Sequence, residues 1–164
     1  MATQESGIVW PSEFEPEPAP VHVRNEIEMA APPERAWAWL VRAPLWPTWY
    51  RNSKRVRLLR GGYPDLALGS RFHWWTFGVP ITSEVREFAP PQRLAWDAVG
   101  TGVRAYHAWL ITPTPRGCHV LTEETQHGVL AQLGAFLMPN RMSKYHQIWL
   151  ESLRDRAEGG LPPT

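Results

Sequence analysis

The sequence predicts an α+β fold in which one antiparallel sheet curves around a long C-terminal helix. Several segments alternate apolar and polar residues, as half-buried strands do. Short turn signals separate the later strands, and such connections join antiparallel neighbours. Near the end of the chain Met142, Trp149 and Leu153 recur at three- and four-residue steps, together with Tyr145 or His146, which is typical of a helix with one buried side.

The first twenty residues differ in composition from the rest of the chain. Their stretch "WPSEFEPEPAP" is acidic and rich in proline, so residues 1–20 are predicted to form an extended arm. Trp10 and Phe14 in this arm could dock on the body of the protein or on a second subunit. Residues 21–158 would then form a single domain, the default for a chain of 164 residues, and residues 159–164 a flexible tail.

The domain begins with a strand and two short helices. The segment "VHVRNEIEM" alternates apolar and polar residues and predicts a strand. The segment "APPERAWAWLV" predicts a helix with Pro33 in its first turn, whereas "PLWPTWY" contains too many prolines for more than a short helix and a turn. Six strands and the final helix follow, and Pro139 should start or kink that helix. The six predicted strands are Val56–Arg60, Ser70–Thr76, Val79–Phe88, Arg93–Val99, Val103–Thr112 and Cys118–His127.

The hairpin turns test whether the sheet has a consistent inner face. We centre the turns on Phe77–Gly78, Pro90–Pro91, Thr101–Gly102 and Pro115–Arg116. Residues opposite each other on neighbouring strands share a face of the sheet. These turns place Val85, Trp96, His107 and Glu124 opposite one another, in one row across four strands. The same registers pair Trp74 with Ile81, Phe72 with Ser83, Ala98 with Ala105 and Trp109 with Thr122. The other face carries Arg71, Glu84, Arg86, Asp97, Arg104 and Glu123. The first face is mostly apolar and should point inward, and a one-residue slip in any turn would break this agreement.

His107 and Glu124 are the predicted catalytic candidates, because the registers place them opposite each other on the inner face. A buried carboxylate would favour the imidazolium form of His107 and would orient one ring nitrogen. The other nitrogen could serve a ligand carbonyl or hydroxyl as acid or base. The alternative is a structural pair that satisfies itself across two strands, since a buried ion pair is not by itself a sign of function.

Aromatic and small polar residues of the inner face could line a ligand cavity. Tryptophan offers both a large apolar ring and an N–H donor, and the chain has 10 of them. The alternative is a tryptophan-rich core in which the small polar groups bond only to neighbouring backbone. The predicted ligand-binding residues are Trp37, Phe72, Trp74, Ser83, Trp96, Trp109, Thr122, Tyr145 and Trp149.

Composition narrows the classes of partner and location. The formal net charge is +1 and no basic run stands out, so neither nucleic acid nor an anionic membrane is an expected partner. The single Cys118 excludes an intrachain disulfide and favours a reducing compartment. With no signal-like N-terminus and no apolar run near the ~20 residues of a membrane span, the prediction is a cytoplasmic protein. The six histidines lack paired metal-binding spacing, so neither a metal nor another cofactor is expected.

Several stretches together resemble a known superfamily over about residues 21–158. They are "EIEMAAPPERAWAWL", "LGSRFHW", "ITSEVREFAPPQRLAW", "AYHAWLITPTPRGCHVLTEET" and the final helix. The chain resembles the START-like SRPBCC superfamily, close to its polyketide cyclase/dehydrase and lipid-transport proteins. The resemblance implies a helix-grip fold, with a seven-stranded antiparallel sheet wrapped around the C-terminal helix and an apolar cavity between them. The N-terminal extension and the aromatic-rich "HWWTFG" depart from the usual pattern.

Three functions are compatible with this sequence. The first is a binding protein for an apolar small molecule, aromatic or acyl/polyketide-like, held in the cavity. The second is an enzyme of cyclase, aromatase or dehydratase type that uses His107 with Glu124. The third is an interaction or accessory subunit, for example a homodimer, that uses the arm. A binding protein needs only an apolar cavity with a few polar anchors, whereas an enzyme needs a second polar group near the ligand, so the first is preferred.

Overall fold

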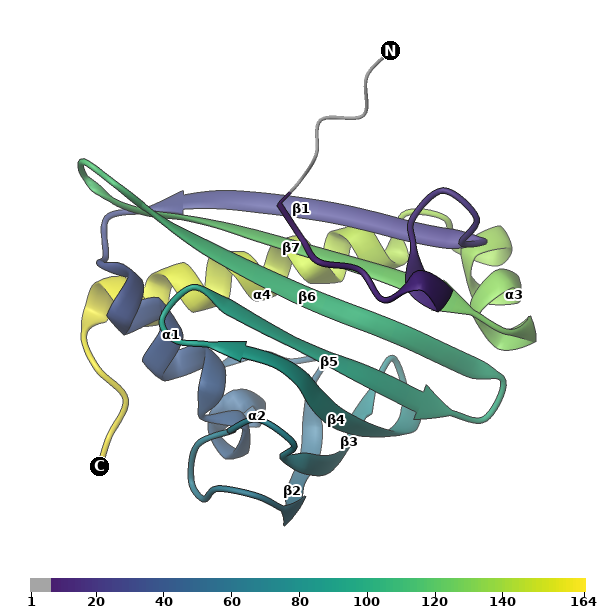
Figure 1. The fold of residues 1–164 in the computed structure, drawn as a ribbon, viewed down its shortest axis with the longest axis horizontal. Helices are drawn as coiled ribbons and strands as arrows, with labels where there is room; N and C mark the ends of the chain where they lie inside the picture. The colour runs from purple at the N-terminus through teal and green to yellow at the C-terminus, as the bar shows by residue number, and fades with distance from the viewer. Residues whose placement is uncertain (1–6) are drawn as a thin grey trace.

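The computed structural model describes residues 7–164 and contains one antiparallel sheet wrapped around the C-terminal helix (Figure 1). The spatial order of the seven strands is β1-β7-β6-β5-β4-β3-β2. The predicted α+β helix-grip fold is therefore confirmed. The strands are β1 (Val21–Met29), β2 (Lys54–Arg60), β3 (Arg71–Thr76), β4 (Val79–Ala89), β5 (Arg93–Gly100), β6 (Val103–Thr114) and β7 (Gly117–His127).

One short helical turn precedes β1, short helical segments connect β1 to β2, and two helices follow β7. The segments are η1 (Ser12–Phe14), α1 (Pro33–Val41), η2 (Ala43–Leu45), α2 (Trp46–Trp49), α3 (Val129–Leu137) and α4 (Arg141–Gly159). Pro33 occupies the first turn of α1 as predicted, where its missing N–H has no helical partner to lose. The helix α3 was not predicted, because "VLAQLGAFL" is apolar on nearly every side and so has no helical periodicity. None of the helices within residues 7–164 is long and apolar enough to cross a membrane.

The predicted strand registers are confirmed. Trp74 pairs with Ile81, and the row of Trp96, His107 and Glu124 runs across β5, β6 and β7. The turn at Pro90–Pro91 differs in detail. Ala89 pairs with Arg93, so this loop has three residues, and the resulting shift is corrected by an irregularity between Val85 and Glu87. The extra residue Arg86 acts as a β-bulge that restores the pairing of Val85 with Trp96.

The concave face of the sheet, α1, α2 and α4 enclose an aromatic core. Trp46 is fully buried, and its ring lies 5.3–5.7 Å from the rings of Phe72, Trp74, Trp96 and Trp149. Its indole N–H donates to the carbonyl of Leu40 at 3.0 Å, so the buried donor is satisfied. This core fixes α4 against the middle of the sheet, and Trp149 is only 1% exposed.

The described part of the N-terminal arm, residues 7–20, docks on the convex face of the same chain (Figure 1), and residues 1–6 of the predicted arm lie outside the described residues. Phe14 is buried, and its ring stacks on that of Tyr106 with centroids 5.6 Å apart. The hydroxyl of Thr125 donates to the carbonyl of Phe14 at 2.9 Å. Glu123 faces the convex side as predicted, but it is buried rather than solvated because the arm lies over it.

Candidate ligand cavity and its buried His–Glu–His cluster

A cavity of about 230 Å³ lies between the concave face of the sheet, α3 and the first half of α4. Tryptophan and aliphatic side chains form most of its wall, with Trp74, Trp96 and Trp149 at its inner end and Leu130 and Met142 nearer the helices. Ligand sites are commonly apolar cavities with a few polar groups that fix orientation. The polar side chains in this wall, tryptophans aside, are Tyr50, Thr76, His107, Glu124, Gln126, Arg141 and His146.

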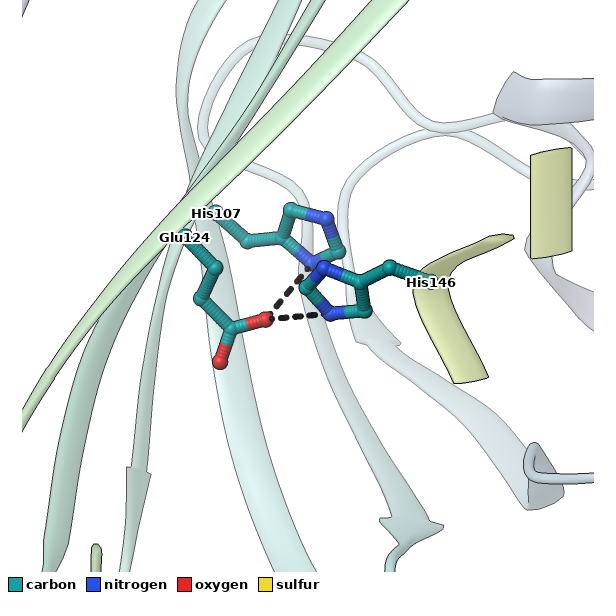
Figure 2. Close-up of side chains that lie close together, drawn as sticks. All are labelled: His107, Glu124 and His146. Atoms are coloured by element: carbon teal, nitrogen blue, oxygen red, sulfur yellow. Dashed lines mark ion pairs between the residues drawn. The ribbon is translucent and has the colours of Figure 1, made fainter. Parts of the chain in front are cut away.

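Three of these polar side chains form a buried cluster (Figure 2). His107 Nδ1 lies 3.2 Å from Glu124 Oε2, and His146 Nε2 lies 3.1 Å from the same oxygen. The two imidazole rings are stacked, with centroids 4.7 Å apart and planes 12° apart. The predicted pair on β6 and β7 is therefore completed by a third residue, which α4 brings from the opposite wall.

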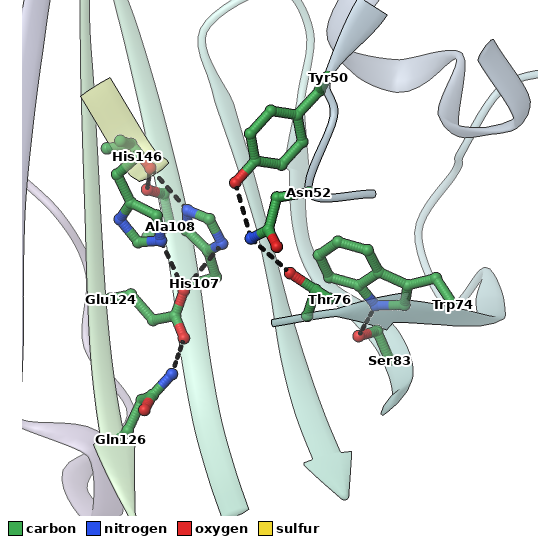
Figure 3. A network of polar contacts seen from close by, with 11 residues as sticks. Tyr50, Asn52, Trp74, Thr76, Ser83, His107, Ala108, Glu124, Gln126 and His146 are labelled. Atoms are coloured by element: carbon green, nitrogen blue, oxygen red, sulfur yellow. Dashed lines mark hydrogen bonds and ion pairs between the residues drawn. The ribbon is translucent and has the colours of Figure 1, made fainter. Parts of the chain in front are cut away.

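Further hydrogen bonds extend the cluster along the sheet. Gln126 Nε2 donates to Glu124 Oε1 at 2.6 Å (Figure 3), and His107 Nε2 lies 2.7 Å from the hydroxyl oxygen of Thr122. Both nitrogens of His107 and both oxygens of Glu124 thus have protein partners. In contrast, Nδ1 of His146 is buried and has no hydrogen-bond partner within the described chain.

Burial determines the charge state of His107. Its pKa is lowered from the ordinary 6.5 to about 3, chiefly by desolvation and also by nearby His146, and these effects outweigh the opposing effect of Glu124. Glu124 favours the imidazolium as expected, but a fully buried ring loses more hydration than one carboxylate replaces, so the net shift of the pKa is downward. Burial alone would raise the pKa of Glu124, but His107 and the hydrogen bonds from His146 and Gln126 lower it, so the carboxylate is ionised.

The position of each proton follows from these charge states. A carboxylate only accepts hydrogen bonds, so the single N–H of neutral His107 lies on Nδ1 and donates to Glu124. The single proton of the Thr122 hydroxyl is then shared between two acceptors, this Nε2 at 2.7 Å and the carbonyl of Ala108, to which the hydroxyl donates at 3.1 Å. His146 donates its Nε2–H to the same carboxylate oxygen, and its Nδ1 faces away from this contact. The nitrogen left without a protein partner therefore belongs to His146 and not to His107.

The cluster also has the residue types of a metal site, with ligand atoms of His107, Glu124 and His146 within 4.8 Å of one another. A metal-binding imidazole directs its lone pair in the ring plane toward an ion about 2 Å away. Here the two ring nitrogens instead face one carboxylate oxygen, Glu124 Oε2, at 3.2 and 3.1 Å, so hydrogen bonds hold the cluster together in this arrangement.

The structure brings five predicted site residues to the cavity wall: His107, Glu124, Trp74, Trp96 and Trp149. The remaining ones are not in this wall: Trp37, Phe72, Ser83, Trp109, Thr122 and Tyr145. Strand alternation assigns a residue to the concave face but does not say how deep along that face the residue lies. Much of the concave face is filled with side chains, and the cavity lies in the part of that face beside α3.

Each residue outside the wall has another contact. Trp37 packs against Phe88, with ring centroids 5.2 Å apart, and Phe72 and Trp109 fill the solid core. The hydroxyl of Ser83 accepts from the indole N–H of Trp74 at 3.1 Å (Figure 3). The Thr122 hydroxyl is engaged by His107, as described above, and Tyr145 lies at the rim against Phe77, with ring centroids 5.5 Å apart.

Sequence reasoning missed His146 and Tyr50 as members of the cavity wall. His146 and Tyr145 are both compatible with the face that carries Trp149, three or four residues further on, so spacing could not choose between them. Tyr50 stacks on Trp149 with centroids 4.3 Å apart, and burial raises the pKa of its hydroxyl. Asn52 donates to this hydroxyl at 3.1 Å (Figure 3). No local sequence pattern predicts this contact.

A helix-grip fold with an apolar cavity and one polar cluster defines a class of small-molecule-binding domains. The family model described as "Polyketide cyclase / dehydrase and lipid transport" matches residues 20–158, and the chain belongs to this family. The predicted resemblance to the START-like SRPBCC superfamily is thereby confirmed. No curated protein matches the chain.

Solved structures with the same fold include proteins of different origin. A hypothetical protein of Helicobacter pylori is 29% identical, with a TM-score of 0.87, over 96% of this chain and 99% of that one. A protein of Thermus thermophilus is 19% identical, with a TM-score of 0.71, over 85% and 98%. The di-domain ARO/CYC StfQ of the steffimycin biosynthetic pathway is 14% identical, with a TM-score of 0.69, over 85% of this chain and 51% of that one. The last two similarities concern the fold alone.

Proposed function

We propose that the protein binds a small apolar molecule that carries one hydrogen-bond donor, with the apolar part in the cavity and the donor on His146. The observation that carries this proposal is a buried nitrogen without a protein partner in a side chain that lines an apolar cavity. A buried polar nitrogen left unpaired is unfavourable, and a ligand hydroxyl would pair it. The family description and the likeness to an ARO/CYC protein support an aromatic or acyl/polyketide-like ligand.

The cavity limits the size and charge of this ligand. A volume of about 230 Å³ lies below the usual range of roughly 300–1,000 Å³ for ligand pockets. One or two fused aromatic rings, or a short acyl chain, therefore suit it better than a large polycyclic compound. Ionised Glu124 beside the acceptor nitrogen disfavours a carboxylate at this end of the ligand.

Two measurements test the binding function. Native mass spectrometry of the freshly purified protein should show a bound small molecule. In titrations followed by tryptophan fluorescence, 2-naphthol should bind more tightly than naphthalene, since only the former has a hydroxyl for His146. His146→Leu should remove this preference, whereas Tyr145→Phe, a change at the neighbouring helix position outside the cavity wall, should keep it. If no molecule accompanies the protein and neither probe binds, the proposal fails.

The geometry also supports a second candidate, acid–base catalysis on the bound ligand. His146 Nδ1 would accept a proton from the ligand, and Glu124, 3.1 Å from Nε2, would stabilise the resulting imidazolium. His107 would then be a positioning residue, since its own nitrogens are occupied by Glu124 and Thr122. This assignment transfers the acid–base role proposed for His107 to His146.

Recovery of the ligand separates the two candidates. The molecule identified by native mass spectrometry, or a synthetic aromatic poly-β-ketone, is incubated with the protein and analysed for cyclised or dehydrated product. Catalysis predicts a product in which the elements of water are lost, and it predicts that His146→Gln lowers turnover more than binding. Quantitative recovery of unchanged compound by a protein that binds it supports the binding function alone.

A further inference from the structure

The helix α3 separates the cavity from solvent and has an apolar outer surface. Its inner side, including Leu130 and Ala131, lines the cavity. On its outer side Phe136 is 82% and Leu137 is 62% exposed, and Val129 and Leu133 are exposed as well. Figure 1 places α3 at one end of the sheet, where no other helix covers it. A cluster of large apolar side chains in water is a typical mark of an interaction site.

The charges around this end of the molecule are segregated. Residues 125–150 contain no Asp or Glu, and Glu124 is the one carboxylate in the cavity wall formed by the described residues. The guanidinium groups of Arg51 and Arg141 lie over the rings of Tyr145 and Phe77, 5.3 and 5.4 Å from the centroids. Exposed Lys144 follows on α4.

We call these three cations the basic rim, and Arg141 lines the same cavity as α3 does. Among the described residues of the arm, Glu13, Glu15 and Glu17 belong to the segment around Phe14 that docks on the convex face, and not to the cavity side of the sheet. The balanced net charge of +1 therefore conceals an uneven distribution. Because the sequence-based argument against an anionic membrane used only the overall balance and the lack of a basic run, it does not apply to this local surface.

We propose that α3 docks on the surface of an anionic lipid bilayer, with Leu133, Phe136 and Leu137 inserted among the lipids and the basic rim facing anionic headgroups. An interfacial helix buries its apolar side at the boundary between headgroups and acyl chains, and nearby cations add attraction to anionic lipids. The nine residues of α3 extend only about 13 Å, far short of a hydrocarbon core of about 30 Å, so the helix lies in the interface.

A second copy of the chain fits this surface less well than a bilayer does. A two-fold dimer through α3 would bring the cations of both rims together, and residues 125–150 offer no acid to pair with them. Docking on a bilayer instead places the cavity wall against lipid, so an apolar molecule could pass between the two without crossing water. This inference goes beyond the proposed function and does not require the cavity to be occupied.

Vesicle sedimentation with the full chain tests the inference. The protein should bind vesicles of phosphatidylcholine mixed with phosphatidylglycerol, should bind pure phosphatidylcholine vesicles more weakly, and should be released by salt. Phe136→Asp should lower partitioning by about tenfold or more, because it puts a charge where apolar surface is buried. Its matched control is Leu161→Asp, at a residue 67% exposed near the C-terminus, which should bind like wild type.

A second pair of variants tests the basic rim. Lys144→Glu should weaken binding to the mixed vesicles by about fivefold or more, the effect of one cation near an anionic surface. Arg35→Glu makes the same change in net charge at an exposed position of α1 and should have little effect. Both variants should keep the wild-type thermal unfolding transition, so that weaker binding reports on docking and not on folding.

Three outcomes would overturn the inference. One is the absence of binding to mixed vesicles, and another is equal binding by wild type and Phe136→Asp. The third is a dimer in light scattering that Phe136→Asp dissociates while vesicles do not bind, because α3 would then be a subunit interface. Binding of 2-naphthol is measured on the same variants, so a failure of docking remains distinguishable from a failure of the cavity as a binding site.

Discussion

Two consecutive glutamates in β7 have opposite surroundings, although each pairs with histidine. Glu124 points to the concave side, where His107, His146 and Gln126 hold both of its oxygens. Glu123 points to the convex side, where His22 Nε2 lies 2.9 Å from one oxygen. The other oxygen of Glu123 is buried without a hydrogen-bond partner in the described structure.

The difference lies in what excludes water from each carboxylate. The sheet and α4 enclose Glu124, and these elements form the core of the fold. The arm covers Glu123 through Trp10, whose ring meets that of His22 edge-on at 6.1 Å, and through Phe14. We expect that the arm can detach without disrupting the core, whereas α4 contributes Trp149, Leu150 and Leu153 to that core. The burial of Glu124 and its histidine partners on the concave face therefore depends on the core of the fold. The burial of Glu123 on the convex face depends on the arm.

The largest effect should come from the helix that closes the concave side. Trp149→Ala should lower the free energy of unfolding by about 3–5 kcal/mol, as aromatic truncations in cores do, and should loosen the wall that holds His146. Urea denaturation measures this loss. Trp75→Ala, a truncation on the half-buried outer side of β3, is the control and should cost less. A loss below about 1 kcal/mol for Trp149→Ala would contradict the packing of α4.

The two glutamates can be compared directly by the same substitution. Glu124→Gln should cost about 2–3 kcal/mol of unfolding free energy, since two buried rings lose a charged acceptor. Glu123→Gln should cost about 1 kcal/mol or less, because His22 is partly solvated. The pKa of His107 should fall further in Glu124→Gln, since the carboxylate raises it, and NMR titration can follow the ring. Equal losses of unfolding free energy in Glu124→Gln and Glu123→Gln would contradict the expected difference between the concave and convex faces.

The arm provides a test of conditional burial. Phe14→Ala should cost about 2 kcal/mol, less than the roughly 3–5 kcal/mol of a core phenylalanine, because the arm can detach instead of leaving a cavity. Hydrogen exchange should rise for amides of the arm and of the convex edge of β7, while amides of α4 stay protected. Faster exchange throughout the sheet would show instead that the arm is required for the fold.

Acid should act first on the concave cluster. Between the unfolded pKa of 6.5 and the folded pKa of about 3, the unfolded chain binds a proton at His107 that the folded chain does not. Stability should therefore fall as the pH is lowered through this window, by about 1 kcal/mol per pH unit. The lowered pKa of Glu124 acts with the same sign at still lower pH. His107→Gln should flatten the upper part of this dependence in urea denaturation at stepwise pH, and an unchanged slope would contradict it.

Much of the fold could be predicted because its determinants are local. Alternation along β1 and β4–β7 assigns a face to every residue, and the two-residue turn at Thr101–Gly102 fixes a register without reference to distant segments. The same rules placed His107 opposite Glu124. The loop at Pro90–Pro91 has one residue more than predicted, but the bulge at Arg86 restores the predicted strand register before the next inward-facing residue.

The remaining features depended on how distant segments meet. Which inward residues border empty space depends on where α3 and α4 lie, so Trp109 and Trp96, two inward positions on neighbouring strands, have different roles. The choice of His146 over Tyr145 depends on the rotation of α4 against β6 and β7. The neutral state of His107 depends on how fully water is excluded, because desolvation and attraction to Glu124 oppose each other and only the depth of burial decides which is larger. The local sequence pattern determines which side of a strand or helix is buried. Tertiary packing sets the distances between these elements, and the distances determine whether a buried side chain lines the cavity, fills the core or joins the polar cluster.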